Sequence, residues 1–251
     1  MTWSIVARDP ATGHFGIAVA SRFFSVGTLV PHIRAGVGAV ATQAFVNPLY
    51  GVDGLTLLAE GKSPEEIVPI LTGRDAGHRQ RQFHLIDATG RNTAFTGAAC
   101  IDWAGHLISD NVSVAGNMLA GPQVIATTLE VFEKTAGKPL IERFLEAMQA
   151  GEDAGGDKRG KQSAAIVIHR DQDYPWLDIR ADDHTDPLAE LRRLYAVAQE
   201  RFLHVAETLP TRANPDGMLD RSVIDRKIAE LEAAREAEGR PSASFATPWK
   251  P

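Results

Sequence analysis

The residue with the clearest chemical potential in this sequence is Thr2, which follows Met1. A side chain this small is compatible with removal of the initiator methionine, which would give Thr2 a free α-amine. A hydroxyl alone is a weak nucleophile near neutral pH, but an α-amine with a pKa of about 7.7 to 8.0 can be neutral and accept the hydroxyl proton. The expected chemistry is attack on an amide-like carbonyl, followed by hydrolysis of an acyl-enzyme.

The first hairpin of the chain predicts what lies beside Thr2. Two strand-like runs, residues 4–8 and 16–21, are joined by a short turn that contains proline and glycine. Folding the chain about that turn sets residue numbers that sum to about 22 or 23 opposite one another in an antiparallel pair. Ala20 or Ser21 is therefore expected to face Thr2.

Polar residues near this hairpin are candidates to assist Thr2. We expect Ser21 to be a partner of the amine, and Arg22 or Arg34 to lower the pKa of the amine or to bind a carboxylate. Amides and hydroxyls near other predicted strand ends would form an oxyanion hole or a substrate clamp, or would instead satisfy local turns. These residues are Gln43, Asn47, Thr96 and Asn117.

A further group surrounds a glycine-rich turn at residues 155–160. Its backbone amides could line an anion site, and the alternative is a structural Asp–Arg pair that holds the loop. The residues concerned are Asp157, Arg159 and Ser163.

Metal and cofactor chemistry have little support in the sequence. Eight histidines are scattered without a zinc-binding spacing, and Cys100 is the single cysteine. Residues 182–186 could bind a cation, but Asp186 would more simply cap the helix that follows. No glycine-rich segment matches a P-loop or a dinucleotide fingerprint. We expect no metal and no cofactor.

The patterning predicts an α+β fold. Residues 37–43 are apolar on both faces, as in a central strand, and residues 83–96 and 163–180 form two more hairpins. Helical periodicity covers residues 51–73 and 127–150. Hairpins separated by helices imply antiparallel sheets covered by helices, and a four-layer αββα sandwich is consistent with this order.

The C-terminal part of the chain differs in composition from the rest. Residues 1–184 are expected to form the main domain, and residues 185–251 a helical extension with an irregular tail from residue 241. Residues 220–240 are charge-dense and carry a narrow apolar stripe, which is typical of a helix that docks lightly or on another subunit. We therefore expect a homodimer or larger homo-oligomer.

Composition restricts the partners and the compartment. The 251 residues are 44% hydrophobic, which is enough for one substantial core. A net charge of -6 without a basic cluster argues against nucleic acid and anionic membranes. One cysteine, no signal-peptide pattern and no apolar run of about 20 residues indicate the cytoplasm. The expected substrate is a small molecule or a peptide.

Several blocks of the sequence resemble a known family. They are residues 2–10, 16–23, 36–43 and 156–164, with shorter matches at 47–48, 94–97 and 116–119. Together they resemble a widespread prokaryotic family of unknown function that is placed structurally among the N-terminal nucleophile (Ntn) hydrolases. The resemblance runs from Thr2 to about Arg180, and it implies the fold without naming a substrate.

Two functional hypotheses follow. The first is a cofactor-independent amidohydrolase that acts through Thr2 on a small amide, a ureido compound or a short peptide. The second is a non-catalytic ligand-binding or assembly protein of the same fold, in which Thr2 merely begins a strand.

Overall fold

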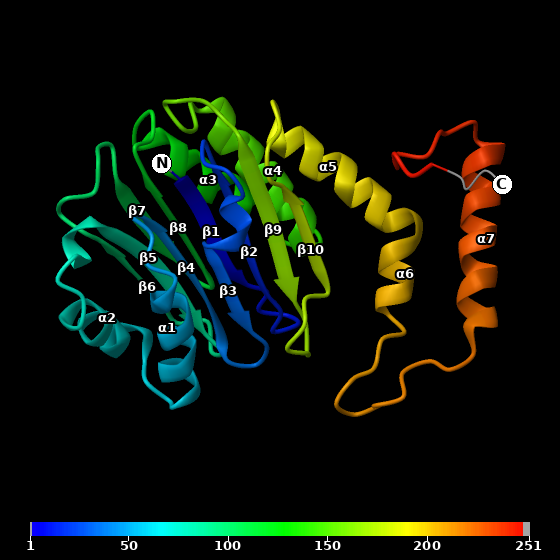
Figure 1. Cartoon of the computed structure of the whole chain (residues 1–251), viewed down its shortest axis with the longest axis horizontal. Coiled ribbons are helices and arrows are strands. Elements are labelled where there is room, and N and C mark those ends of the chain that lie inside the picture. Colours follow the sequence, from blue (N-terminus) through cyan, green and yellow to red (C-terminus); the bar gives the residue numbers. More distant parts are fainter. Residues whose placement is uncertain (1, 248–251) are drawn as a thin grey trace. The chain divides into compact units, whose positions relative to one another are not determined.

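The computed structural model describes residues 2–247 (Figure 1). Met1 and residues 248–251 lie outside the described residues. The predicted removal of Met1 and the end of the predicted tail concern these residues. The chain divides into two compact units that meet between Leu191 and Arg192. The sequence analysis began the C-terminal extension at residue 185, shortly before helix α5 (Pro187–Val197).

Unit 1 contains two antiparallel sheets. The six-stranded sheet has the order β10-β9-β2-β1-β8-β7, and the four-stranded sheet has the order β3-β4-β5-β6. The strands are β1 (Thr2–Arg8), β2 (Phe15–Ser21), β3 (Pro31–Arg34), β4 (Gly38–Ala44), β5 (Arg81–Asp87), β6 (Asn92–Thr96), β7 (Gly105–Ser109), β8 (Val112–Asn117), β9 (Ser163–His169) and β10 (Leu177–Ala181). Their mixture with helices confirms the predicted α+β class.

The three predicted hairpins are present as β1–β2, β5–β6 and β9–β10. In the first of them Trp3 pairs with Ala20, so paired residue numbers sum to 23 and Ser21 faces Thr2. Gly13 closes the turn with φ +78°, a conformation that glycine adopts without steric cost. The sequence therefore predicted this register to within one residue.

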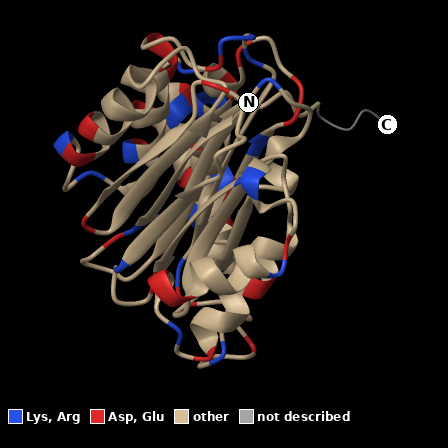
Figure 2. Ribbon diagram, turned by 90° about the vertical axis from the view of Figure 1, so that its left-hand side faces the viewer, with Lys and Arg blue, Asp and Glu red and all other residues tan. Residues whose placement is uncertain are grey.

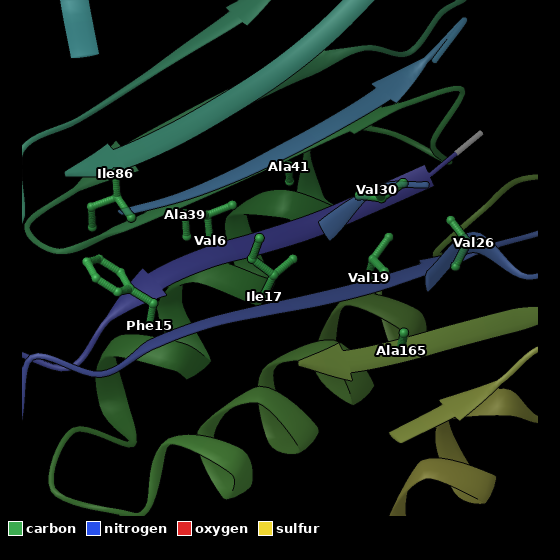
Figure 3. Packing of buried hydrophobic residues seen from close by; sticks show 10 residues of the cluster. All are labelled: Val6, Phe15, Ile17, Val19, Val26, Val30, Ala39, Ala41, Ile86 and Ala165. Atoms are coloured by element: carbon green, nitrogen blue, oxygen red, sulfur yellow. The ribbon is translucent and has the colours of Figure 1, made fainter. Parts of the chain in front are cut away.

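An apolar core lies between the two sheets (Figure 3). Alternate residues of the β1–β2 hairpin, such as Val6 and Ile17, point toward Ala39 and Ala41 of β4. Side chains on a strand alternate between its faces, so Thr2 and Ser4 lie on the same inner face as Val6. The inner face is thus apolar in the middle of β1 and polar toward its beginning.

Helices cover the outer face of each sheet (Figure 1). Helices α1 (Leu49–Ala59) and α2 (Pro64–Gly73) pack on the four-stranded sheet, and α3 (Gln123–Lys134) and α4 (Leu140–Asp153) pack on the six-stranded sheet.

Local signals explain where these helices lie. Helix α2 begins with a capping box between Ser63 and Glu66. Gly16 lets α4 approach β2, because a Cβ there would lie 2.4 Å from a ring carbon of Phe144. Each of the two sheets therefore has one face on the shared core and one face under helices.

Charged residues lie mostly on the helices and connecting loops of the main domain (Figure 2). This distribution leaves the inner faces of the sheets largely uncharged, as the core requires. Among the described residues, no helix has the length and apolar character needed to cross a bilayer.

Helices are the regular structure in the described part of unit 2. A π-helical segment, Ala198–Phe202, leads into α6 (Leu203–Ala206), and α7 covers Arg221–Ala237. Asp220 caps α7 by accepting a hydrogen bond from the Ser222 N–H at 2.9 Å. An ion pair of 3.0 Å between Arg235 and Glu200 joins α7 to the π-helical segment.

Candidate active site

Thr2 lies at the first position of β1, on the face that looks toward the four-stranded sheet. Its side chain is almost covered, because the residue exposes only 6% of its surface. Thr2 Oγ1 lies 3.1 Å from Ser21 Oγ, and either hydroxyl can donate. The pairing of β1 with β2 holds the two hydroxyls together.

A small pocket opens at the Thr2 side chain. Its volume is about 80 Å³. Its walls are mostly apolar, and two polar side chains besides Thr2 reach it. The lining residues are Thr2, Phe23, Val26, Leu29, Val30, Gln43, Ala44, Val46 and Arg159. A substrate group that enters this pocket therefore meets the Thr2 side chain.

Three buried amide side chains surround the backbone of Thr2. The amide nitrogens of Gln43 and Asn117 lie 3.5 Å and 3.4 Å from the Thr2 carbonyl oxygen, to which they donate. Both nitrogens also donate to Gln82 Oε1, at 2.9 Å and 3.1 Å. These bonds fix the Thr2 backbone from the opposite sheet and from β8. Gln43 and Asn117 thus position Thr2 in addition to any contact with a substrate.

The polar layer continues from Gln43 to a buried histidine. Ser4 Oγ donates to Gln43 Oε1 at 2.7 Å, so its single hydrogen is used there. His84 Nε2, 2.8 Å from Ser4 Oγ, must then be the donor in that contact. In a neutral ring, His84 Nδ1 then accepts from the hydroxyl of Ser113, at 2.8 Å.

This pattern of bonds requires a neutral imidazole. Burial, reinforced by repulsion from His106, lowers the pKa of His84 to about 3. His84 is fully buried and makes no contact with the pocket, so its role is to hold the polar layer together.

Thr96 belongs to the far end of the same layer. Its Oγ1 accepts from Gln82 Nε2 at 2.9 Å and lies 2.9 Å from His106 Nδ1. Gln82 also donates to the carbonyl oxygen of Gly116 at 2.8 Å. Thr96 is therefore linked to Thr2 through Gln82, and it does not line the pocket.

Asp157 organises the glycine-rich loop beside the pocket. Its carboxylate accepts from the backbone N–H of Arg22 at 2.9 Å and from that of Arg159 at 2.8 Å. The Arg159 guanidinium lies 3.3 Å from the same carboxylate. Ser163 accepts from the Val26 N–H at 3.1 Å and donates to the Phe23 carbonyl. The loop is thus held as a structural Asp–Arg pair, and it brings Arg159 to the pocket.

Arg34 and Asn47 do not line the Thr2 pocket. Arg34 is exposed and pairs with Gly38 at the far end of β4, five residues from Gln43. At about 3.3 Å per residue this places it roughly 16 Å along the strand from the Thr2 carbonyl. Asn47 donates to the Asp75 carboxylate at 3.4 Å and accepts from the Leu49 N–H at 3.1 Å, so it satisfies a local turn.

Arg22 contributes through its backbone. Its side chain is exposed, and its N–H is the group that meets Asp157. The predicted effect of the Arg22 guanidinium on the pKa of the Thr2 amine therefore stays a prediction.

The remaining candidates are explained locally. Asp186 Oδ1 accepts from the Ala189 N–H at 3.1 Å, which is the capping role considered for it. Cys100 is half-buried, and burial raises the pKa of its thiol. Within residues 2–247, no group of three or more His, Cys, Asp or Glu side chains is placed to hold a metal ion.

The sequence analysis missed Ser4, Gln82, His84 and Ser113. A usable signal was present for two of them, because Gln82 and His84 alternate with apolar residues in β5 and so share one buried face. Polar side chains on an otherwise buried strand face need partners, which predicts a network. The identity of those partners depends on how the two sheets meet.

The chain resembles a known protein family along most of its length. The model of a family of unknown function, DUF1028, matches residues 2–191, so the chain is a member of the DUF1028 family. The crystal structure of a DUF1028 protein from Silicibacter pomeroyi superposes with a TM-score of 0.81 and 32% identity, over 87% of this chain and 96% of that one.

A more distant likeness exists to Anbu, an ancestral beta-subunit, from Yersinia bercovieri. It has a TM-score of 0.38 and 14% identity, over 83% of this chain and 98% of that one. None of the curated proteins matches the sequence. The comparisons therefore establish the family and leave its chemistry to be argued from the site.

Proposed function

We propose that this protein is an amidohydrolase of the N-terminal nucleophile type, with Thr2 as the nucleophile. The observation that carries the proposal is the position of the Thr2 hydroxyl, 3.1 Å from Ser21 Oγ and at the wall of a small pocket. An arrangement of helices, two facing sheets and helices, with a nucleophile at the start of an inner strand, supports the same reading. The proposed chemistry requires removal of the residue that precedes Thr2, because the α-amine of Thr2 must be free.

The proposed reaction uses the two functional groups of Thr2. The neutral α-amine accepts the hydroxyl proton, directly or through one water, as Oγ1 bonds to the carbonyl carbon of the substrate amide. The C–N bond of the tetrahedral intermediate then breaks, and the leaving amine takes up the proton. Water hydrolyses the resulting ester and restores Thr2. Ser21 orients Oγ1 throughout.

The surrounding residues hold the nucleophile in a fixed position. Gln43 and Asn117 hold the Thr2 carbonyl, so the strand start cannot shift as Oγ1 attacks. A misplacement of about 1 Å can cost roughly 100-fold in rate, because productive attack needs reacting atoms about 3 Å apart. The buried amide layer therefore serves the proposed chemistry by preorganisation.

The test begins with the mass of the intact protein. One preparation is the protein as expressed, and in a second a removable fusion is cleaved to leave Thr2 first. A carbonyl electrophile directed at an amine and a hydroxyl should add one equivalent to Thr2 and none to Thr2→Ala. Thr12→Ala, in the exposed hairpin turn, is the matched control and should be labelled like the unaltered protein.

Two outcomes would count against the proposal. Equal labelling of Thr2→Ala and the unaltered protein would remove Thr2 as the nucleophile. Absence of labelling when Thr2 is known to be the first residue would favour the alternative, a non-catalytic ligand-binding protein.

A further inference from the structure

A second hollow adjoins the Thr2 pocket. Its volume is about 370 Å³, against about 80 Å³ for the first. Ala44 lines both. Thr2 lines the smaller hollow, and its cross-strand partner Asn117 lines the larger one. Neighbouring strands lie about 4.8 Å apart, so one pair of adjacent residues reaches both hollows.

We propose that the two hollows are subsites for the two halves of one substrate. The smaller subsite takes a short, uncharged aliphatic acyl group, and the larger subsite takes a bulkier amine portion with an apolar surface. The inference rests on the proposed function, because it assigns the acyl half to the side on which the Thr2 hydroxyl lies.

The smaller subsite sets the acyl group by size. An apolar cavity of roughly 150 Å³ is enough to hold benzene, so 80 Å³ is too small for an aromatic ring and suits a few carbon atoms. Val26, Val30 and Val46 supply apolar walls to match.

The smaller subsite also offers no uncompensated charge. Arg159 reaches it, but the guanidinium is paired with the buried Asp157 carboxylate at 3.3 Å. Two backbone N–H donors also meet that carboxylate, which keeps it in place. A charged acyl group would lose hydration here without a free partner of opposite sign.

The larger subsite has a different character. Phe45 and Ile101 line it and expose 68% and 61% of their surfaces. The Arg81 guanidinium lies 5.1 Å from the centre of the Phe45 ring, which orients the ring at the mouth. Gln80 and Asn117 add amide groups to the wall. An amine portion with an aromatic or branched apolar part and a hydrogen-bonding group fits these surfaces.

Two residues with unusual backbone geometry lie at the subsites. Ala44 has φ +71° and Met118 has φ +54°, a left-handed conformation that is uncommon for residues other than glycine. Each directly follows an amide residue that holds the Thr2 carbonyl. The same two strand ends therefore position Thr2 and line the subsites, Ala44 in both and Met118 in the larger one.

The experiment measures kcat/KM for two series of amides with the protein whose first residue is Thr2. In the acyl series, acetyl, isobutyryl, phenylacetyl and succinyl groups are joined to 4-nitroaniline. In the amine series, the isobutyryl group is joined to ethylamine, 4-nitroaniline and tryptamine. We expect isobutyryl to exceed phenylacetyl and succinyl by at least tenfold, and tryptamine to exceed ethylamine.

Variants assign each preference to its subsite. Val46→Phe fills the smaller subsite and should lower kcat/KM for isobutyryl at least tenfold more than for acetyl. Phe45→Ala removes a wall of the larger subsite and should lower kcat/KM for the tryptamine amide but not for the ethylamine amide. Phe24→Ala is the control, because Phe24 is 63% exposed and lines neither subsite.

The outcomes separate the two proposals. Hydrolysis through Thr2 with equal rates across the acyl series, or with Val46→Phe unselective, would overturn the subsites and leave the nucleophile standing. Absence of both hydrolysis and Thr2 acylation across every amide would overturn the proposed function, and the subsite assignment with it.

Discussion

The hydroxyl oxygens of Thr2 and Ser21 lie 3.1 Å apart on adjacent strands, in a contact buried from solvent. The two residues are 19 positions apart in the sequence, and a single hairpin brings them together. The turn sets the register of the hairpin, and this register places the two residues opposite each other. The amides that hold the Thr2 carbonyl, in contrast, come from β4 and β8.

A double-mutant cycle will measure this contact. We expect Thr2→Ala and Ser21→Ala each to lower the free energy of unfolding, and the two together to lower it by less than their sum. The coupling should be about 1 kcal/mol, the usual net value of a buried hydrogen bond. Urea unfolding of the four proteins gives the number. Strict additivity would mean that the hydroxyls do not interact.

The amide layer should contribute more to stability than the hydroxyl pair. Gln82→Leu removes the Gln82 donor from the buried carbonyl oxygens of Gly105 and Gly116, and it removes one acceptor of the Gln43 and Asn117 amides. Each unsatisfied buried group costs about 1–3 kcal/mol, so we expect a loss of about 3 kcal/mol or more.

The control for this change lies two residues away. Gln80 is exposed, and Gln80→Leu should alter stability by no more than about 0.5 kcal/mol. Thermal and urea unfolding will compare the two variants. Similar small effects for both would show that the amide layer is not needed for the fold.

Stability should fall in mild acid because of His84. Burial lowers its pKa to about 3 in the folded protein, whereas an exposed imidazole titrates near 6.5. Between these values the unfolded chain binds more protons, so the free energy of unfolding decreases as the pH falls from about 6.5 toward 3. The contribution is complete above pH 6.5, and its slope is at most about 1.4 kcal/mol per pH unit.

The slope distinguishes His84 from other groups. His84→Gln should flatten the dependence of stability on pH between about 4 and 6, even though the variant is less stable throughout. Gln80→Leu removes no titratable group, so it should leave the slope as it was. Denaturant midpoints across that pH range are the measurement, and an unchanged slope in His84→Gln would mean that another group titrates.

The last prediction concerns association of the protein with a second copy of itself. Within unit 2 no residue of α7 is fully buried, and Leu231 exposes 40% of its surface on the apolar stripe. We expect a homodimer at micromolar concentration by light scattering, and a monomer for Leu231→Glu. Lys227→Glu, an exposed change on the same helix, should leave the dimer intact. A monomeric mass for the unaltered protein would rule the prediction out.

Much of the local structure was predictable because it depends on short-range chemistry. The proline- and glycine-containing turn and the two strand-like runs around it predicted the first hairpin. The sequence analysis made no prediction for β8, whose residues pair with β1 over a separation of more than a hundred positions. No local pattern encodes that register.

The candidate site also combines contacts set by local structure with contacts set by the packing of distant segments. The sequence by itself determined that a threonine begins an inner strand and that Ser21 faces it, because a turn sets the register of its own hairpin. Only the tertiary structure decided that Gln43 and Asn117 meet at the Thr2 carbonyl, with Gln82 bonded to both, and that Arg34 lies elsewhere. Those positions depend on how two sheets stack, which is settled by burial over the whole core.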